Sequence, residues 1–167
     1  MKKFILFYWL NIAILFVMLY WGISPLANII NSLQTDFTTY LVSLTLNENL
    51  TKSYEILINN HYSLVIEKAC NGMIPYIFFL ASIFAFPATI KHKIKWAIIG
   101  YIIITAINIF RIWLVTKLVL AEIDNFSLAH DFIGNSILIF TALLLFIIFI
   151  KTKRKKNDNN KIFSQRQ

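Results

Sequence analysis

The sequence predicts an all-α membrane protein: a four-transmembrane-helix bundle with an amphipathic helix and a short β-hairpin outside the membrane, and both termini cytoplasmic. Of its 167 residues, 58% are hydrophobic and only 14% are charged, whereas a soluble domain carries about 25% charged residues. The apolar residues form four long blocks, and a membrane-spanning helix needs about 20 such residues. The basic residues gather on one side of these blocks, as membrane topology requires.

The four predicted spans cover residues 4–23, 73–90, 96–115 and 132–150 of a single membrane domain, residues 1–150. The first block also has features of a cleaved signal peptide, because Lys2 and Lys3 precede it and small residues follow it. Its apolar run is longer than the roughly 7–15 residues of a signal-peptide core. We therefore expect a retained helix.

Charge then orients the bundle. With the N-terminus inside, twelve of the 16 Lys and Arg residues are cytoplasmic and seven of the eight acidic residues are outside. This distribution follows the positive-inside rule. The net charge of +8 is thus a topology signal and an attraction to anionic membrane lipid, and no nucleic-acid partner is predicted. The Lys/Asn-rich segment 151–167 is predicted to be a disordered, basic cytoplasmic tail.

The segment outside the membrane, residues 24–69, begins with an amphipathic pattern. Ser24 suits a helix N-cap and Pro25 suits the first turn. We expect this helix to lie on the outer membrane surface or to cover the bundle. Residues 54–58 and 62–67 are then predicted to form two short strands. The apolar residues with spacings of three and four are Leu26, Ile29, Ile30, Leu33, Phe37, Tyr40, Leu41 and Leu44.

Three reactive side chains are predicted to lie at the same depth, near the outer ends of three spans. Arg111 lies inside the third span, where an ionisable residue is a functional candidate, although it can also snorkel to the headgroups. Cys70 precedes the second span and His130 the fourth. A lone Cys is usually a small buried residue, and a lone His is usually solvated. Their shared depth favours a common site.

These groups suit nucleophilic catalysis by a thiol. Cys70 is the candidate nucleophile, and a helix N-terminus or a cation favours the reactive thiolate. His130 is the candidate proton carrier. Attack on a peptide carbonyl gives a thioacyl intermediate. Arg111 serves either the thiolate or, with backbone N–H groups around Asn71 and Gly72, the oxyanion.

Two further residues are candidates for supporting roles. Asn108 is one turn from Arg111 and either holds the guanidinium or packs between helices. Asp131 either orients His130 or interacts with backbone amides at the helix start. One cysteine and three scattered histidines without HExxH spacing argue against a metal site, and the four glycines form no phosphate loop. No cofactor is predicted.

Over residues 50–150 the sequence resembles the exosortase/archaeosortase family. The similarity lies in Glu67-Lys68-Ala69-Cys70-Asn71-Gly72, Asn108-Ile109-Phe110-Arg111, and Ala129-His130-Asp131 before a final apolar helix. The resemblance implies a membrane cysteine transpeptidase whose catalytic Cys, Arg and His are Cys70, Arg111 and His130. With one predicted span before Cys70, the chain resembles a compact bacterial member.

The resemblance also implies partners and a location. Its substrates would be secreted proteins with C-terminal transmembrane sorting tails, cleaved and joined to an unidentified surface acceptor. The enzyme would lie in the cell (inner) membrane with its site facing the periplasm or the exterior. The alternative is a non-catalytic membrane scaffold or assembly partner with an inert Cys70 and a snorkelling Arg111.

Overall fold

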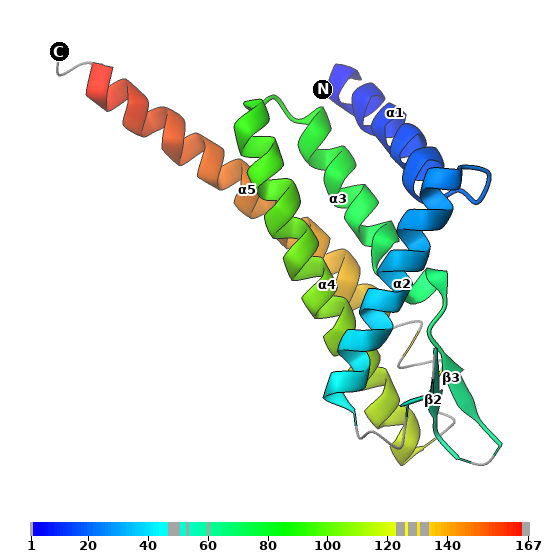
Figure 1. Ribbon diagram of the computed structural model, residues 1–167. Helices are drawn as coiled ribbons and strands as arrows, with labels where there is room; N and C mark the ends of the chain where they lie inside the picture. Colours follow the sequence, from blue (N-terminus) through cyan, green and yellow to red (C-terminus); the bar gives the residue numbers. More distant parts are fainter. Residues whose placement is uncertain are drawn as a thin grey trace.

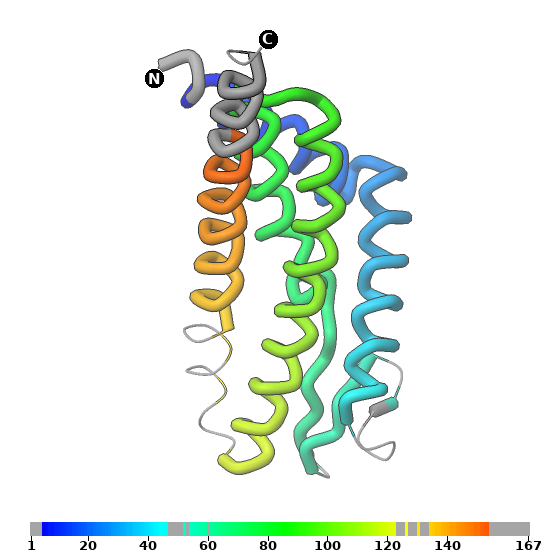
Figure 2. The backbone as a smooth tube through the Cα atoms, turned by 90° about the vertical axis from the view of Figure 1, so that its left-hand side faces the viewer, coloured from blue at the N-terminus to red at the C-terminus, as the bar shows by residue number. Residues whose placement is uncertain are grey.

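The protein is mostly helical, with a small sheet at one end (Figure 1). The structure is a computed structural model that describes residues 2–46, 51–52, 54–59, 61–122, 126, 130 and 134–164. The beginning of α1 and the end of α5 lie at the end opposite the sheet (Figure 2). The elements are α1 (Lys2–Leu19), α2 (Pro25–Thr45), β1 (Thr51–Lys52), β2 (Glu55–Leu57), β3 (Ser63–Val65), the 3₁₀ turn η2 (Lys68–Cys70), α3 (Met73–Ala85), α4 (Ile90–Ala121) and α5 (Asn135–Ser164).

Two helices are long and apolar enough to cross a membrane, α4 over Ile90–Ala121 and α5 over Asn135–Lys153, within the described residues. The apolar stretches Ile5–Leu19 and Met73–Ala85 are shorter. The predicted spans 4–23 and 73–90 therefore exceed the helices found there. For α3 the reason is Pro87, because proline holds the preceding Phe86 in an extended conformation.

Helix α5 is longer than the sequence predicted, since it continues to Ser164 through most of the tail that we expected to be disordered. Lys and Arg are good helix formers. Adding residues to a helix that already exists avoids the unfavourable nucleation step. The tail therefore extends the last span as a helix.

Helices α3, α4 and α5 share the main apolar core, which contains Phe79, Trp96, Ile104 and Phe149. Gly100 of α4 allows α3 to approach closely. A Cβ atom on Gly100 would lie 2.1 Å from Cε1 of Phe79, so the ring packs directly on the α4 backbone. Small residues at helix contacts are typical of membrane bundles, where close packing replaces the hydrophobic effect.

Helix α2 packs along α4 and so covers the bundle (Figures 1 and 2). Ser24 caps it by accepting a hydrogen bond from the Ala27 N–H, and Pro25 opens its first turn, which confirms both predictions. The helix buries its polar face and exposes its apolar face, which is the reverse of an amphipathic helix in a soluble protein. Asn31, Gln34 and Thr38 face inward, while the apolar residues Leu26, Ile29, Leu33, Phe37, Tyr40 and Leu44 are exposed.

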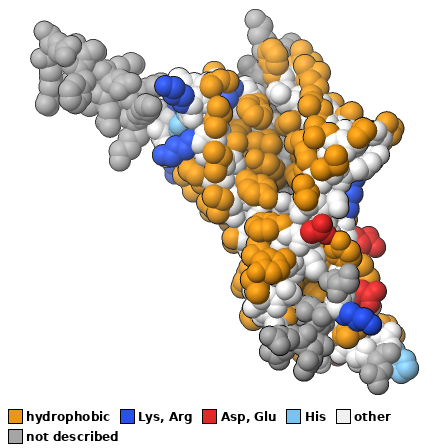
Figure 3. Space-filling view, viewed as in Figure 1, with side chains coloured by type: hydrophobic (Ala, Val, Ile, Leu, Met, Phe, Trp, Pro, Cys, Tyr) orange, Lys and Arg blue, Asp and Glu red, His pale blue; other side chains and the backbone are white. Residues whose placement is uncertain are grey.

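The sheet has the order β1-β2-β3 and is antiparallel throughout. One face packs on α2 and α4 through Ile56 and Ile66. Tyr54 donates a hydrogen bond to Asp36 of α2, and this bond, followed by the carboxylate charge, raises the pKa of Tyr54 above its usual value. On the face seen in Figure 3, Asp and Glu gather toward the sheet end, while apolar side chains cover much of the helical part.

Candidate active site

Cys70 lies at the end of the 3₁₀ turn η2, between the sheet and the start of α3. Its N–H donates to the Glu67 carbonyl at 2.8 Å, and its own carbonyl accepts from Nδ2 of Asn108 at 2.8 Å. The thiol is free and half-buried. Both backbone groups of Cys70 are thus hydrogen-bonded, which fixes the position of the sulfur.

His130 lies beside the thiol. Its Nε2 lies 3.7 Å from the Cys70 Sγ. Phe126 stacks on the imidazole with ring centroids 5.2 Å apart and an interplanar angle of 17°. The stacked ring restricts the imidazole plane, so His130 presents an edge nitrogen to the sulfur.

Arg111 is buried on α4, with 3% of its surface exposed. Its Nη2 donates to Oδ1 of Asn135 at 3.2 Å, and its Nη1 lies 3.5 Å from Oδ1 of Asn108. A snorkelling side chain extends out to the headgroups. The guanidinium of Arg111 instead lies between α4 and α5. This position is incompatible with the snorkelling interpretation.

Asn108 connects the nucleophile to the cation. Its amide nitrogen donates to the Cys70 carbonyl, and its amide oxygen accepts from Arg111. It has no exposed surface. Of the two roles considered for this residue, the structure supports the one that holds the guanidinium, and it adds the hydrogen bond to Cys70.

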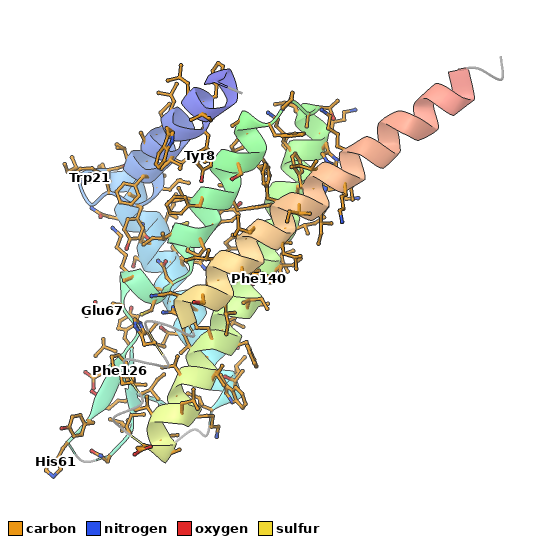
Figure 4. All side chains as sticks on the ribbon, turned by 180° about the vertical axis from the view of Figure 1, so that it is seen from behind. Tyr8, Trp21, His61, Glu67, Phe126 and Phe140 are labelled. Atoms are coloured by element: carbon orange, nitrogen blue, oxygen red, sulfur yellow. The ribbon has the colours of Figure 1, made fainter. Side chains whose placement is uncertain are left out.

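The three predicted reactive residues line one cavity of about 340 Å³. Its wall also includes Glu67 and Phe126, which Figure 4 shows between the helices and the hairpin tip at His61. Most of the other lining is apolar, from Ile56, Leu64, Ile66, Ile112 and Val115. The arrangement therefore places a thiol, an imidazole and a guanidinium against a space that accepts an apolar chain.

Asn71 and Gly72 are not among the residues that line this cavity, and the oxyanion role of their N–H groups stays a prediction. Their role is to shape the chain after Cys70. Gly72 has φ of 79° and caps α3, and a Cβ there would lie 3.2 Å from Cγ of Asn108. Only glycine adopts this conformation without strain.

A buried polar network holds Asn71. Its amide oxygen accepts from the Met73 N–H at 2.9 Å, its Nδ2 donates to Oδ1 of Asn31 at 3.0 Å, and its carbonyl accepts from Gln34 at 3.2 Å. The Tyr101 hydroxyl donates to Oε1 of Gln34 at 2.5 Å. Helix α2 thereby positions the segment that carries the nucleophile.

Sequence reasoning missed Asn31, Gln34, Tyr101 and Phe126. A signal existed for the first two, because Asn31, Gln34 and Thr38 repeat at helical spacing opposite the apolar stripe of α2. Such a polar stripe marks the buried face of a helix that contacts lipid on its other face. Asp131 lies outside the described residues, so its predicted role stays a prediction.

No group of three or more His, Cys, Asp or Glu side chains that could bind a metal occurs among the residues with described coordinates.

A family model described as transmembrane exosortase matches residues 2–147. No curated protein and no solved structure matches the chain.

Proposed function

The chain belongs to the transmembrane exosortase family, and from this membership we propose that it is a membrane-embedded cysteine transpeptidase. Its proposed substrates are secreted proteins with a C-terminal transmembrane sorting tail. The enzyme cleaves the tail and transfers the new C-terminus to a surface acceptor. Cys70 is the proposed nucleophile, with His130 and Arg111 as its catalytic partners.

The observation that carries this proposal is the 3.7 Å approach of His130 Nε2 to Cys70 Sγ in a cavity that Arg111 also lines. A thiol beside an imidazole is the arrangement of nucleophile and base in cysteine acyl transfer. The non-catalytic alternative needs an inert Cys70 and a snorkelling Arg111. The burial of Arg111 argues against it.

In the proposed reaction, His130 takes the thiol proton while the sulfur attacks the scissile carbonyl carbon. The carbonyl becomes an oxyanion, which the guanidinium of Arg111 stabilises. When the C–N bond breaks, His130 returns the proton to the leaving amine and a thioester remains on Cys70. The acceptor nucleophile, deprotonated by His130, then attacks the thioester and releases the thiol.

We further propose that α1, α3, α4 and α5 form the membrane bundle in the cell membrane, with the sheet end outside. The apolar helices and the family support a membrane location. The Lys residues of the first turns of α4, together with Lys151 and Lys153 of α5, lie at the end opposite the sheet, and positive residues favour the cytoplasmic side. A substrate tail would then reach the site from the lipid.

Trapping the acyl-enzyme tests the function. The chain should be co-expressed with a candidate sorting-tail protein and compared with Cys70→Ala and His130→Ala. We expect processing by wild type and none by Cys70→Ala, because the thioester cannot form. Since Cys70 is the only cysteine, any hydroxylamine-sensitive adduct of wild type must be on that residue.

His61→Ala is the matched control for His130→Ala, because His61 is exposed at the hairpin tip (Figure 4). It should process the substrate like wild type, with equal amounts of protein in the membrane. Unchanged processing by Cys70→Ala would eliminate the proposed function.

A further inference from the structure

Strand β3 has an unpaired edge that runs along the cavity. Its pairing with β2 is antiparallel, and the bonds from Ile58 N–H to the Tyr62 carbonyl and from Ile66 N–H to the Tyr54 carbonyl define which residues face β2. In an antiparallel pair, hydrogen-bonded and non-hydrogen-bonded positions alternate. Ser63 and Val65 are therefore the positions whose N–H and C=O groups point away from β2.

No partner for these edge groups occurs within the described part of the chain. The sheet order makes β3 an outer strand. Five consecutive residues, 63–67, line the cavity that also contains Cys70 and His130. At about 3.3 Å per residue, these five residues extend roughly 16 Å along the cavity toward Cys70.

A second wall of the cavity is apolar and belongs to α4, and its residues Ile112 and Val115 lie in the same apolar clusters as Leu64 of β3. An extended peptide between the two walls would pair its backbone with β3. Every second side chain would then point toward α4, because side chains alternate along a strand. Backbone pairing would supply affinity and the apolar wall would supply specificity for apolar side chains, as in other cases of strand addition.

We propose that the substrate segment next to the scissile bond binds as an additional strand on the free edge of β3, with alternate apolar side chains against α4. This inference rests on the proposed function, since it concerns how that substrate reaches Cys70. It makes Ser63 and Val65 substrate-binding residues through their backbone. Binding of this kind requires an extended, unfolded segment and depends little on its exact sequence.

Val65→Pro removes one edge N–H without removing a β2–β3 bond, because that N–H points away from β2. Val65→Ala is the matched control: it also loses the valine side chain but keeps the N–H. The probe is acetyl-Val-Thr-Val-Ala chloromethyl ketone, whose methylene carbon is attacked by Cys70 with loss of chloride. Iodoacetamide, which has no peptide backbone to pair, measures the intrinsic reactivity of the thiol.

We expect the rate advantage of the peptide ketone over iodoacetamide to be about fivefold smaller in Val65→Pro than in Val65→Ala, since the backbone hydrogen bond donated at position 65 is lost. A peptide ketone N-methylated at its central residues should lose the same advantage on wild type. This second arm needs no variant, so it stands even when Val65→Pro does not fold.

An equal advantage in Val65→Pro and Val65→Ala, or an undiminished rate with the N-methylated peptide, would overturn the edge proposal. Neither result bears on the proposed function, which is tested separately by the processing of sorting-tail proteins. Conversely, the chain could react faster with the peptide ketone and yet process no sorting-tail protein. In that case the edge proposal stands and the proposed function is wrong.

Discussion

At the scale of single residues, Asn108 has an unusual position, because it contacts both the nucleophile's backbone and the cation. An amide offers a donor and an acceptor at once, and Asn108 uses one for the Cys70 carbonyl and the other for Arg111. No charged side chain offers both. Asn108 therefore links the backbone at Cys70 to the guanidinium through one buried side chain.

Arg111→Lys should lower the rate of substrate processing by about a hundredfold or more. Lysine keeps the positive charge but lacks the planar guanidinium, which hydrogen-bonds both Asn108 and Asn135. The measurement is the single-turnover rate of processing in membranes. Lys117→Arg, the reverse exchange at an exposed position of the same helix, is the control and should be neutral. Full activity in Arg111→Lys would mean that charge alone suffices.

The three reactive residues were predictable from the sequence, because topology places the ends of three spans at one level. Their partners were not. Tyr101 and Gln34 are 67 residues apart and meet through a single hydrogen bond, and no local pattern encodes such a pair. The hydrogen bonds that Asn71 makes to Asn31 and Gln34 were unpredictable for a similar reason, since they depend on tertiary packing.

At the scale of elements, α2 shows what helical periodicity can and cannot predict. The spacing of its apolar residues predicted the helix and its cap correctly. Periodicity does not say which face is buried, because that depends on the solvent around the protein. With lipid outside, the apolar stripe is exposed and the amides of Asn31 and Gln34 are buried, where each finds a partner.

The junction between η2 and α3 depends on glycine. Gly72→Ala should lower the free energy of unfolding by about 1–2 kcal/mol, because a side chain is strained at positive φ. It should also displace Asn108, and thereby slow alkylation of Cys70 by iodoacetamide. Thermal unfolding in detergent and the alkylation rate are the two measurements.

Gly22→Ala is the control for this prediction. A Cβ at Gly22 would meet Oδ1 of Asn28 at an ordinary 3.8 Å. We expect a stability change within about 0.5 kcal/mol and no change in alkylation. Equal effects of the two substitutions would show that the left-handed conformation at Gly72 is unimportant.

Helix lengths were the weakest part of the sequence prediction. Apolar composition continues past the C-terminal end of α3, but Pro87 ends the helix at Ala85, whereas its start at Met73 agrees with the predicted span. The lengths of α4 and α5 were underestimated instead. Hydropathy measures how apolar a segment is, whereas capping residues and proline decide where its helix begins and ends.

At the scale of the whole molecule, the termini and the sheet define two ends, and the charges differ between them (Figures 2 and 3). In a Cys70→Ala background, His61→Cys should be labelled by a membrane-impermeant maleimide in intact cells. Lys151→Cys should be labelled only after lysis, because basic residues are retained inside. The two positions serve as controls for each other. The opposite labelling pattern would invert the proposed topology.

The shortness of α3 has a consequence for the fate of the thioester. Its 13 residues extend roughly 20 Å, against a hydrocarbon layer of about 30 Å. In the orientation proposed above, the cytoplasmic end of α3 lies at the boundary of this layer, and the sulfur is then recessed below the outer surface. Bulk water is scarce at that depth. The recess therefore favours a long-lived acyl-enzyme that partitions to an incoming acceptor before hydrolysis can discharge it.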